Sequence, residues 1–384
     1  MFGEPGDVEA SGFRGLHLGD GLVIDRRGGH AAITIAHEVE NTHLHGAVPS
    51  LCFGACSAEV LAGLSPANLR LAAGQGVVRA VPRGDSMIVI GKGSVQSGEC
   101  DVMGHMNVRH YLARAGDGLA WLALALGITP DRGFFAPVDQ HIRFLREMAA
   151  GTAFTIFGGI VERRGDRLRV YAEIRNSGTG VAAAALVSDI ELRDPRSGEV
   201  LPLPAGLDGK IASLALTLPD HAGPRGLPFD PIRMPPDLAA TAAMGLTEAH
   251  LGAIRAEDCD RAGLMRPDVV IARIWDGVPN LRFRGSEELG AREEGIGSAA
   301  LEYRLVYLRP MRMGDLLIIH SGLRALGEKT TTWTHLLHDG VTGAPVAAAE
   351  AIGIGVDLKA RKAVVIDGDR RRVLEALLVP GLSL

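Results

Sequence analysis

The sequence predicts an α+β protein made of tandem copies of one unit, in which a long apolar helix is followed by an antiparallel sheet. Three observations support this prediction. Two segments repeat each other, the first copy contains a helix-periodic segment, and period-two segments follow it in both copies. With 384 residues, the chain is long enough for two or three domains with separate cores.

The internal repeat relates Glu99–Gly118 to Asp258–Gly277. The two segments align without gaps at a constant offset of 159 residues. Identical residues occur at Cys100/Cys259, Asp101/Asp260, Gly104/Gly263, Met106/Met265, Ala113/Ala272, Arg114/Arg273, Asp117/Asp276 and Gly118/Gly277. A repeat at a fixed offset indicates a duplicated structural unit.

A helix is predicted directly after the start of each repeat. In the first copy, VRHYLARAGDGLAWLALALG has apolar residues at helical spacing, and Gly127 suits the position after the last turn. In the second copy, Pro267 fits the first helical turn.

Strands are predicted after each helix. From Val138 and from Leu301 the residues alternate between polar and apolar, and both runs reach a glycine, Gly151 or Gly314. Asp139 and Glu302 hold matching positions there, and we expect both on a solvent-exposed face. Further strands are predicted at Phe154–Glu162, Arg167–Ile174 and Ala182–Glu191, and at Leu316–Leu323, Thr330–Leu337 and Val346–Val356.

These elements set the expected boundaries at 88–194 for the first unit and 249–384 for the second. The Pro/Gly-rich residues 195–248 are expected to be an extended connection rather than a core element. Residues 1–87 contain strand-like and helix-like segments. Two interpretations stay open for them: a shortened third copy, or an extension that packs on the first unit.

Composition excludes several classes of function. A net charge of −5 and 4% aromatic residues argue against nucleic acid or an anionic membrane as partner. Four cysteines without a CxxC pair favour a reducing compartment, and the first residues lack the pattern of a signal peptide. No apolar run is long enough to cross a bilayer. We therefore expect a cytoplasmic protein.

The sequence lacks the motifs of several large enzyme classes. GxGxxG, GxxxxGK[ST] and GxSxG are absent, so nucleotide-dependent oxidoreductases, P-loop proteins and α/β-hydrolases have no support. His37, Glu38, His43 and His45 cluster, but Asn41 stands where a zinc-binding helix needs histidine. We expect neither a metal nor a redox cofactor.

The segment Asp101-Val-Met-Gly-His-Met-Asn107, followed by Tyr111, resembles the motif of hotdog-fold acyl-CoA thioesterases of the 4-hydroxybenzoyl-CoA type. Within this family, the residues Gly104–Asn107 (GHMN), followed by Gly116-Asp117 in the helix, are most similar to the betainyl-CoA type of thioesterase. The resemblance covers about residues 88–192 and, more weakly, 250–357. It implies tandem hotdog folds, each a long central helix wrapped by an antiparallel sheet, and an acyl-CoA substrate that carries coenzyme A.

The resemblance also implies residue roles. Asp101 matches the family's catalytic carboxylate, and His105 and Asn107 match its positioning residues, with Gly104, Met106 and Tyr111 beside the substrate. The chemistry is consistent, because a carboxylate can activate water or attack a thioester directly. The thiolate is a tolerable leaving group with a pKa of about 8.5, and a helix N-terminus favours the developing oxyanion.

The second copy departs from this pattern. Asp260 is retained, but Leu264 and Arg266 replace the histidine and the asparagine. Arg266 either binds a CoA phosphate or lies on the surface, and for a single arginine the surface is favoured. Asp117, repeated as Asp276, is a second candidate for the catalytic carboxylate. The alternative is a structural carboxylate that caps a loop in both copies.

The sequence thus predicts a thioesterase that hydrolyses a small or medium acyl-CoA. A hotdog enoyl-CoA hydratase and a non-catalytic acyl-CoA or acyl-carrier binding protein are the alternatives. Because hotdog units bury sheet edges by pairing, we also expect a homo-oligomer, in the simplest case a dimer.

Overall fold

The computed structural model describes residues 24–27, 30–33, 87–289 and 295–384, with side chains described over 87–281 and 295–384. The chain divides into two units, Met1–Val77 and Val78–Leu384. In the first unit, β1 (Ile24–Arg27) and β2 (His30–Ile33) form an antiparallel pair. The other elements expected before residue 87, the histidine cluster at 37–45 and the question of a third copy lie outside the described residues.

The second unit contains the two predicted copies. The first copy comprises β3 (Ile88–Ser94), α1 (Val108–Ala125), β4 (Phe134–Phe144), β5 (Ala153–Arg164), β6 (Arg167–Asn176) and β7 (Ala182–Arg193). The second comprises β9 (Thr247–Ala253), α4 (Pro267–Leu289), β10 (Ile296–Tyr307), β11 (Leu316–Leu326), β12 (Thr330–Asp339) and β13 (Pro345–Asp357). The predicted helices and strands are confirmed, and each copy has one further strand before its helix.

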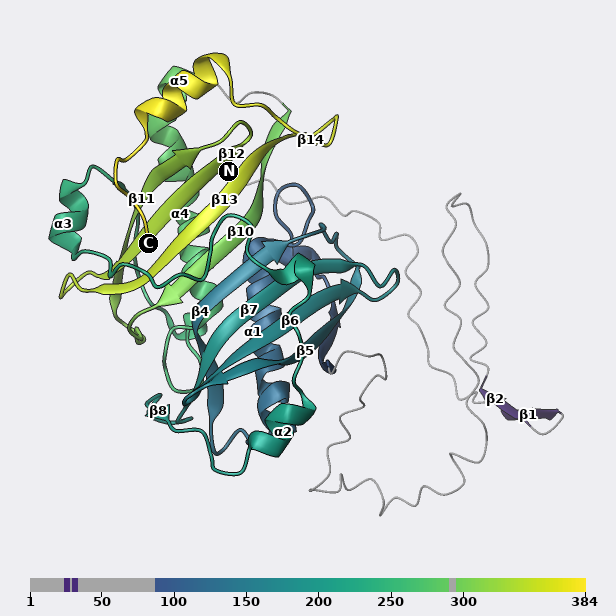
Figure 1. Cartoon of the computed structure of the whole chain (residues 1–384). Coiled ribbons are helices and arrows are strands. Elements are labelled where there is room, and N and C mark those ends of the chain that lie inside the picture. Colours follow the sequence, from purple (N-terminus) through teal and green to yellow (C-terminus); the bar gives the residue numbers. More distant parts are fainter. Residues whose placement is uncertain (1–23, 28–29, 34–86, 290–294) are drawn as a thin grey trace, which may run out of the picture. The chain divides into compact units, whose positions relative to one another are not determined.

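The two copies share one continuous antiparallel sheet. Its order is β3-β5-β6-β7-β4-β10-β13-β12-β11-β9, and the short strands β8 (Val200–Leu201) and β14 (Lys362–Ala363) pair with β7 and β13. The copies meet where β4 pairs with β10, with His141 opposite Arg304. The helices α1 and α4 pack against each other on one side of this sheet (Figure 1). None of the described helices is both long enough and apolar enough to cross a membrane.

Helix α1 forms because its N-cap, the glycine after its last turn and its apolar face all favour a helix over the same residues. Asn107 is the N-cap, and its side-chain oxygen accepts a hydrogen bond from the Arg109 N–H at 3.1 Å. Gly127 takes a φ of +84° after the last turn, a conformation that costs glycine little. Buried residues recur every three or four positions, including Tyr111, Leu112, Ala115, Leu119 and Leu122.

Helix α4 begins differently because Arg266 stands at the position of the Asn107 cap. Pro267 opens the helix, and since proline has no N–H, one unpaired donor of the first turn is removed. Asp268 places a carboxylate in that turn, where the helix dipole favours negative charge. The second copy has therefore replaced a capping side chain by two other stabilising features.

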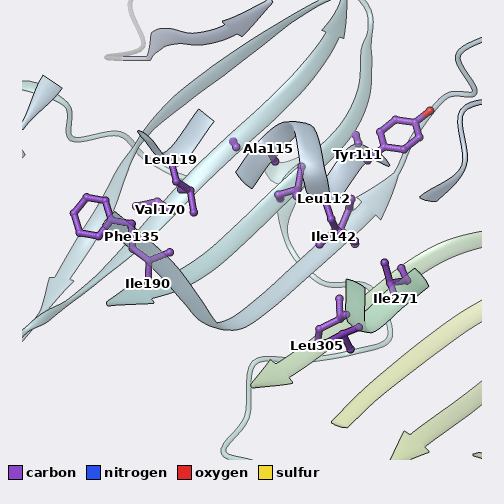
Figure 2. Packing of buried hydrophobic residues seen from close by; sticks show 14 of the residues in the cluster. Tyr111, Leu112, Ala115, Leu119, Phe135, Ile142, Val170, Ile190, Ile271 and Leu305 are labelled. Carbon is purple, nitrogen blue, oxygen red and sulfur yellow. The ribbon is translucent and has the colours of Figure 1, made fainter. Parts of the chain in front are cut away.

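A single hydrophobic core spans both copies. Ile142 of β4 and Leu305 of β10 are completely buried, and both belong to the cluster that also contains Leu112 and Ile271 from the two helices. Figure 2 shows Ile271 and Leu305 approaching the first copy's residues. Because this core is continuous across the β4–β10 junction, the copies form one folding unit.

The segment 195–248 does more than connect the copies, so the expectation of a connection without core residues was wrong. It contains α2 (Asp208–Ser213), a 3-10 turn at Asp220–Ala222 and α3 (Leu238–Ala243). Its Leu203, Leu207 and Leu214 join the main core. Ala222 and Phe229 pack with Tyr171 in a second cluster.

This coverage also corrects the expected exposure of Asp139 and Glu302. Glu302 is only 3% exposed, because its carboxylate accepts the backbone N–H groups of Arg225, Gly226 and Leu227 at 3.0–3.2 Å. It also lies 2.6 Å from Nε2 of buried His141. Asp139 pairs with Arg304 at 2.7 Å. The matching acidic positions thus serve the junction between the copies.

Candidate active site

The repeated aspartate closes the same turn in both copies. Asp101 Oδ1 accepts the backbone N–H groups of Met103 at 2.8 Å and His105 at 3.2 Å. Asp260 Oδ1 accepts those of Ala262 at 2.8 Å and Leu264 at 3.0 Å. The geometry is the same in both copies. It gives each aspartate a structural role and leaves its second carboxylate oxygen for other contacts.

Glycine is needed in this turn for its backbone conformation. Gly104 and Gly263 have φ values of +80° and +74°, which favour residues without a Cβ atom. No atom lies within 4 Å of the place where a Cβ would stand at either position. The requirement is therefore conformational and does not come from a close approach of another group.

The DVMGHMN loop, Asp101–Asn107, also contains His105, Met106 and Asn107. His105 Nε2 is 3.4 Å from a Glu147 carboxylate oxygen, and its buried Nδ1 has no hydrogen-bond partner. Asn107 caps α1. Met106 and Tyr111, expected beside the substrate, are 4% and 3% exposed and belong to the core.

A cavity of about 310 Å³ lies between the two copies. One wall comes from α1 and β4, and the other from the loop around Leu264, the first turn of α4 and the end of β10. The candidate residues Asp117, Asp260 and Arg266 line it, whereas Asp101, His105 and Asn107 are not among its lining residues. The structure thus separates the candidates into two groups.

Asp117 of α1 lines this cavity and is itself exposed to solvent. Burial raises the pKa of the Asp117 carboxyl, and the carboxylate of Asp268 adds to the rise. The positive charges of Arg114 and Arg266 oppose it. A carboxyl group with a raised pKa beside a cavity is suited to proton transfer.

Arg266 lines the cavity and keeps 35% of its side chain exposed, so it is at once a cavity residue and a surface arginine. Its Nη1 donates to the Glu257 carbonyl at 2.6 Å, and its Nε lies 3.1 Å from Asp268 Oδ1. Asp268 is 5% exposed and also lies 3.5 Å from Arg109 Nη2. Held in this way, the guanidinium is a fixed positive charge in the cavity wall.

Sequence reasoning missed three residues of this wall. The Tyr307 hydroxyl donates to Gln140 Oε1 at 3.1 Å and lies 3.3 Å from the Pro267 carbonyl, and burial raises the pKa of Tyr307. Asp268 orients Arg266. Gln140 and Tyr307 lie in strands whose residues simply alternate between polar and apolar, and Asp268 lies in the first turn of a helix. None of these positions has a distinctive sequence pattern, and the three residues come together only because the two copies pair.

Arginines also line the cavity. Arg167 and Arg193 both pair with Glu191, at 3.1 and 2.5 Å, and Arg309 lies on the opposite wall. With Arg266, four arginines line the cavity, and four carboxylates, Asp117, Glu191, Asp260 and Asp268, balance their charge. In the described part of the chain, no three His, Cys, Asp or Glu side chains gather in a way that could hold a metal ion.

The comparisons with known proteins agree with this architecture. The model of the thioesterase-like superfamily matches residues 95–239 and 254–377. A 12:0-ACP thioesterase from Umbellularia californica has a similar structure, with a TM-score of 0.53 and 14% identity over 70% of this chain and 94% of that one. No curated protein sequence matches the chain significantly.

Two further solved structures have the same extent of similarity. A putative oleoyl thioesterase from Lactobacillus plantarum gives a TM-score of 0.53 and 12% identity over 71% of this chain and 97% of that one. An acyl-ACP thioesterase from Bacteroides thetaiotaomicron gives 0.51 and 12% over 70% and 98%. These likenesses confirm the tandem hotdog fold. Because the family model covers both copies and most of the chain, the protein belongs to the thioesterase-like superfamily and is a thioester hydrolase.

Proposed function

We propose that the cavity between the copies is the active site of an acyl-CoA thioesterase and that Asp117 is its catalytic carboxylate. The observation that carries this proposal is the placement of Asp117 and Arg266, which come from different copies and line one cavity. Of the two carboxylates that the sequence offered, Asp117 lines this cavity, and Asp101 closes a turn.

The proposed reaction uses one proton-transfer group and one fixed cation. The Asp117 carboxylate takes a proton from water while the water oxygen attacks the thioester carbonyl carbon. Arg266, held by Asp268, stabilises the negative charge that develops on the carbonyl oxygen. When the carbon–sulfur bond breaks, the proton on Asp117 passes to the leaving thiolate, giving a carboxylic acid and a free thiol.

The carrier is proposed to be coenzyme A. Arg167, Arg193 and Arg309 in the cavity lining are the groups that would contact the phosphates of a CoA thioester. Two of the similar solved structures are described as thioesterases of acyl-ACP. An acyl carrier protein carries the same phosphopantetheine arm, so it is the carrier against which CoA must be compared.

The size of the cavity favours a small or medium acyl group. Its volume of about 310 Å³ is close to the lower end of the range for small-molecule sites, about 300–1,000 Å³. The phosphates of CoA would then remain outside the buried part. Pairing of the copies within one chain completes the cavity, so the expected homodimer is not required for it and stays a prediction.

The test is release of free thiol from matched acyl-CoA and acyl-ACP substrates with short, medium, branched and aromatic acyl groups. The proposal predicts release from acyl-CoA at higher kcat/KM than from the same acyl-ACP. A higher kcat/KM for acyl-ACP would show that the carrier is the acyl carrier protein instead of CoA, while the hydrolysis reaction would stand. Loss of enoyl absorbance without thiol release would favour a hydratase, and binding without turnover would favour a binding protein.

A further inference from the structure

We propose that Gln140 and Tyr307 hold the water molecule that attacks the thioester, and that Ser188 fixes their orientation. This role rests on the proposed function, because it concerns the same cavity and the same reaction. It is carried by a chain of hydrogen bonds between the three side chains, at positions where the duplicated copy has apolar and aromatic residues.

The hydrogen-bonded chain crosses from the first copy to the second. Gln140 of β4 donates from Nε2 to Ser188 Oγ of the neighbouring strand β7 at 3.1 Å. The hydroxyl of Tyr307 in β10 donates to Gln140 Oε1 at 3.1 Å and lies 3.3 Å from the Pro267 carbonyl oxygen. Ser188 and Gln140 are each 4% exposed, and Gln140 and Tyr307 line the cavity. These contacts fix the orientation of the Gln140 amide.

The duplication identifies the equivalent residues of the other copy. Strand residues correspond at an offset of 163, as for Gly151 and Gly314. The junction of the copies confirms this offset, because His141 lies opposite Arg304, its own equivalent. The junction therefore relates the two copies by an approximate two-fold axis.

The polar chain occurs in only one of the two equivalent places. The equivalents of Ser188, Gln140 and Tyr307 are Ala351, Tyr303 and Phe144, in that order. Tyr303 lies opposite Ala351 in the sheet, as Gln140 lies opposite Ser188. Tyr303 and Phe144 make an edge-to-face contact with a ring separation of 6.4 Å. The same strand positions thus fold with an aromatic pair and an alanine.

The fold gains little from the polar version of this packing. A hydrogen bond inside a protein replaces one with water, so its net contribution to stability is only about 0.5–1.5 kcal/mol. Replacement of both partners by apolar groups of similar shape is nearly neutral. Because the other copy uses that solution, we assign the polar chain to the cavity that it lines.

The chain leaves one donor and one acceptor for a ligand. The Gln140 amide has a second N–H, and the Tyr307 oxygen has a lone pair, neither of them with a partner among the described residues. Burial raises the pKa of Tyr307, so its hydroxyl stays protonated at neutral pH and keeps donating to Gln140. A water molecule fits this pair, because it accepts from the amide and donates to the phenol oxygen.

Asp117 and Tyr307 lie around the same helix turn. The Asp268 carboxylate, in the first turn of α4, raises the pKa of both groups, and Tyr307 contacts Pro267 in that turn. A water molecule held by Gln140 and Tyr307 keeps its second hydrogen for the Asp117 carboxylate. During the attack this proton passes to Asp117, and the other stays on the attacking oxygen and donates to Tyr307.

The test measures kcat and KM for thiol release in Tyr307→Phe, Ser188→Ala and the double variant. Both substitutions introduce the residue of the other copy, so both should fold. Because the water loses its alignment, Tyr307→Phe should lower kcat by about 10- to 100-fold and change KM less than about twofold. Ser188→Ala should lower kcat by a smaller factor, and by less in the Tyr307→Phe background than in the wild type, because it acts through the same chain.

Tyr303→Phe is the matched control. It removes a tyrosine hydroxyl from the same strand, and Tyr303 is 4% exposed and is not among the lining residues of the cavity. Its kcat should equal that of the wild type. Near-ultraviolet circular dichroism establishes folding, and Gln140→Met replaces Tyr307→Phe if that variant unfolds.

Three results would overturn the inference: an unchanged kcat in a folded Tyr307→Phe, an effect confined to KM, or an equal loss of kcat in Tyr303→Phe. Failure of the proposed function gives a different result. The wild type then releases no thiol, or a folded Asp117→Asn keeps full activity, and either result overturns the water-holding role as well.

Discussion

Arg109 Nη2 and Asp268 Oδ2 lie 3.5 Å apart and link the first turns of the two central helices. The two residues occupy equivalent positions of the duplicated sequence. In a symmetric homodimer, one residue type would face itself across the axis, and like charges would repel. Fusion of the copies into one chain allows opposite charges at this place, and Asp268 also orients Arg266.

Loss of the Asp268 charge should therefore weaken the junction. In Asp268→Asn, Arg109 and Arg266 lose their shared carboxylate, and the free energy of unfolding should fall by about 1.5–3 kcal/mol. Denaturant unfolding measures the change. Asp276→Asn is the control, because Asp276 is mostly exposed and its removal should cost less than about 1 kcal/mol. Equal effects of the two variants would contradict the role of the junction.

The pH dependence of hydrolysis should reflect Asp117. A general base works only when it is deprotonated, so the rate should fall as the pH drops through the pKa of this group. Because burial raises that pKa, the acidic limb should lie above the ordinary aspartate value of about 3.9. Profiles of kcat/KM against pH measure it, and a limb at or below the ordinary value would argue against Asp117.

Stability should also depend on pH, through a residue outside the cavity. His335 is buried beside Ser321, with Nδ1 2.8 Å from the hydroxyl oxygen, and burial lowers the pKa of His335 to about 3. Between about pH 6.5 and 3 the unfolded chain binds one proton more at this position, so stability falls as the pH falls. The contribution is about 1.4 kcal/mol per pH unit.

Replacement of His335 by glutamine removes this proton and keeps a polar side chain beside Ser321. The difference in unfolding free energy between the wild type and His335→Gln should therefore change by about 1.4 kcal/mol per unit between pH 6 and pH 4. Chemical denaturation at several pH values measures it. A constant difference would show that this histidine stays protonated in the native state.

Asn107 can be tested as a helix cap separately from catalysis. Asn107→Ala should cost about 1 kcal/mol of stability, because the Arg109 N–H loses its acceptor. Asn107→Asp retains an acceptor and should restore stability. If the residue acts only as a cap, kcat/KM per folded molecule will be near the wild-type value in both variants. A loss of kcat/KM in an Asn107→Asp variant of full stability would instead show that Asn107 takes part in the reaction.

The sequence predicted the fold because its signals are local and duplicated. Asn107, Gly127 and the apolar face of α1 are consistent with one another, and the period-two segments match the observed strands closely. The strand β9 was not predicted, because its partner β11 lies far along the chain, beyond α4 and β10.

The candidate site was harder to predict, because it is formed by residues from both copies. The resemblance drew attention to Asp101, whose turn is repeated at Asp260, and a turn-forming aspartate is as easily retained as a catalytic one. The cavity depends on the pairing of α1 with α4. A contact between two helices has no distinctive sequence pattern.

The most direct measurement compares thiol release by Asp117→Asn and Asp101→Asn with that of the wild type, on the best acyl-CoA and with folding checked for each variant. We predict that Asp117→Asn lowers kcat by about 10²- to 10⁴-fold, as expected for loss of a general base. Asp101→Asn should mainly lower stability, because its turn loses a charged acceptor. The opposite pattern, with full activity in Asp117→Asn and none in a folded Asp101→Asn, would place the reaction in the DVMGHMN half and contradict the proposal.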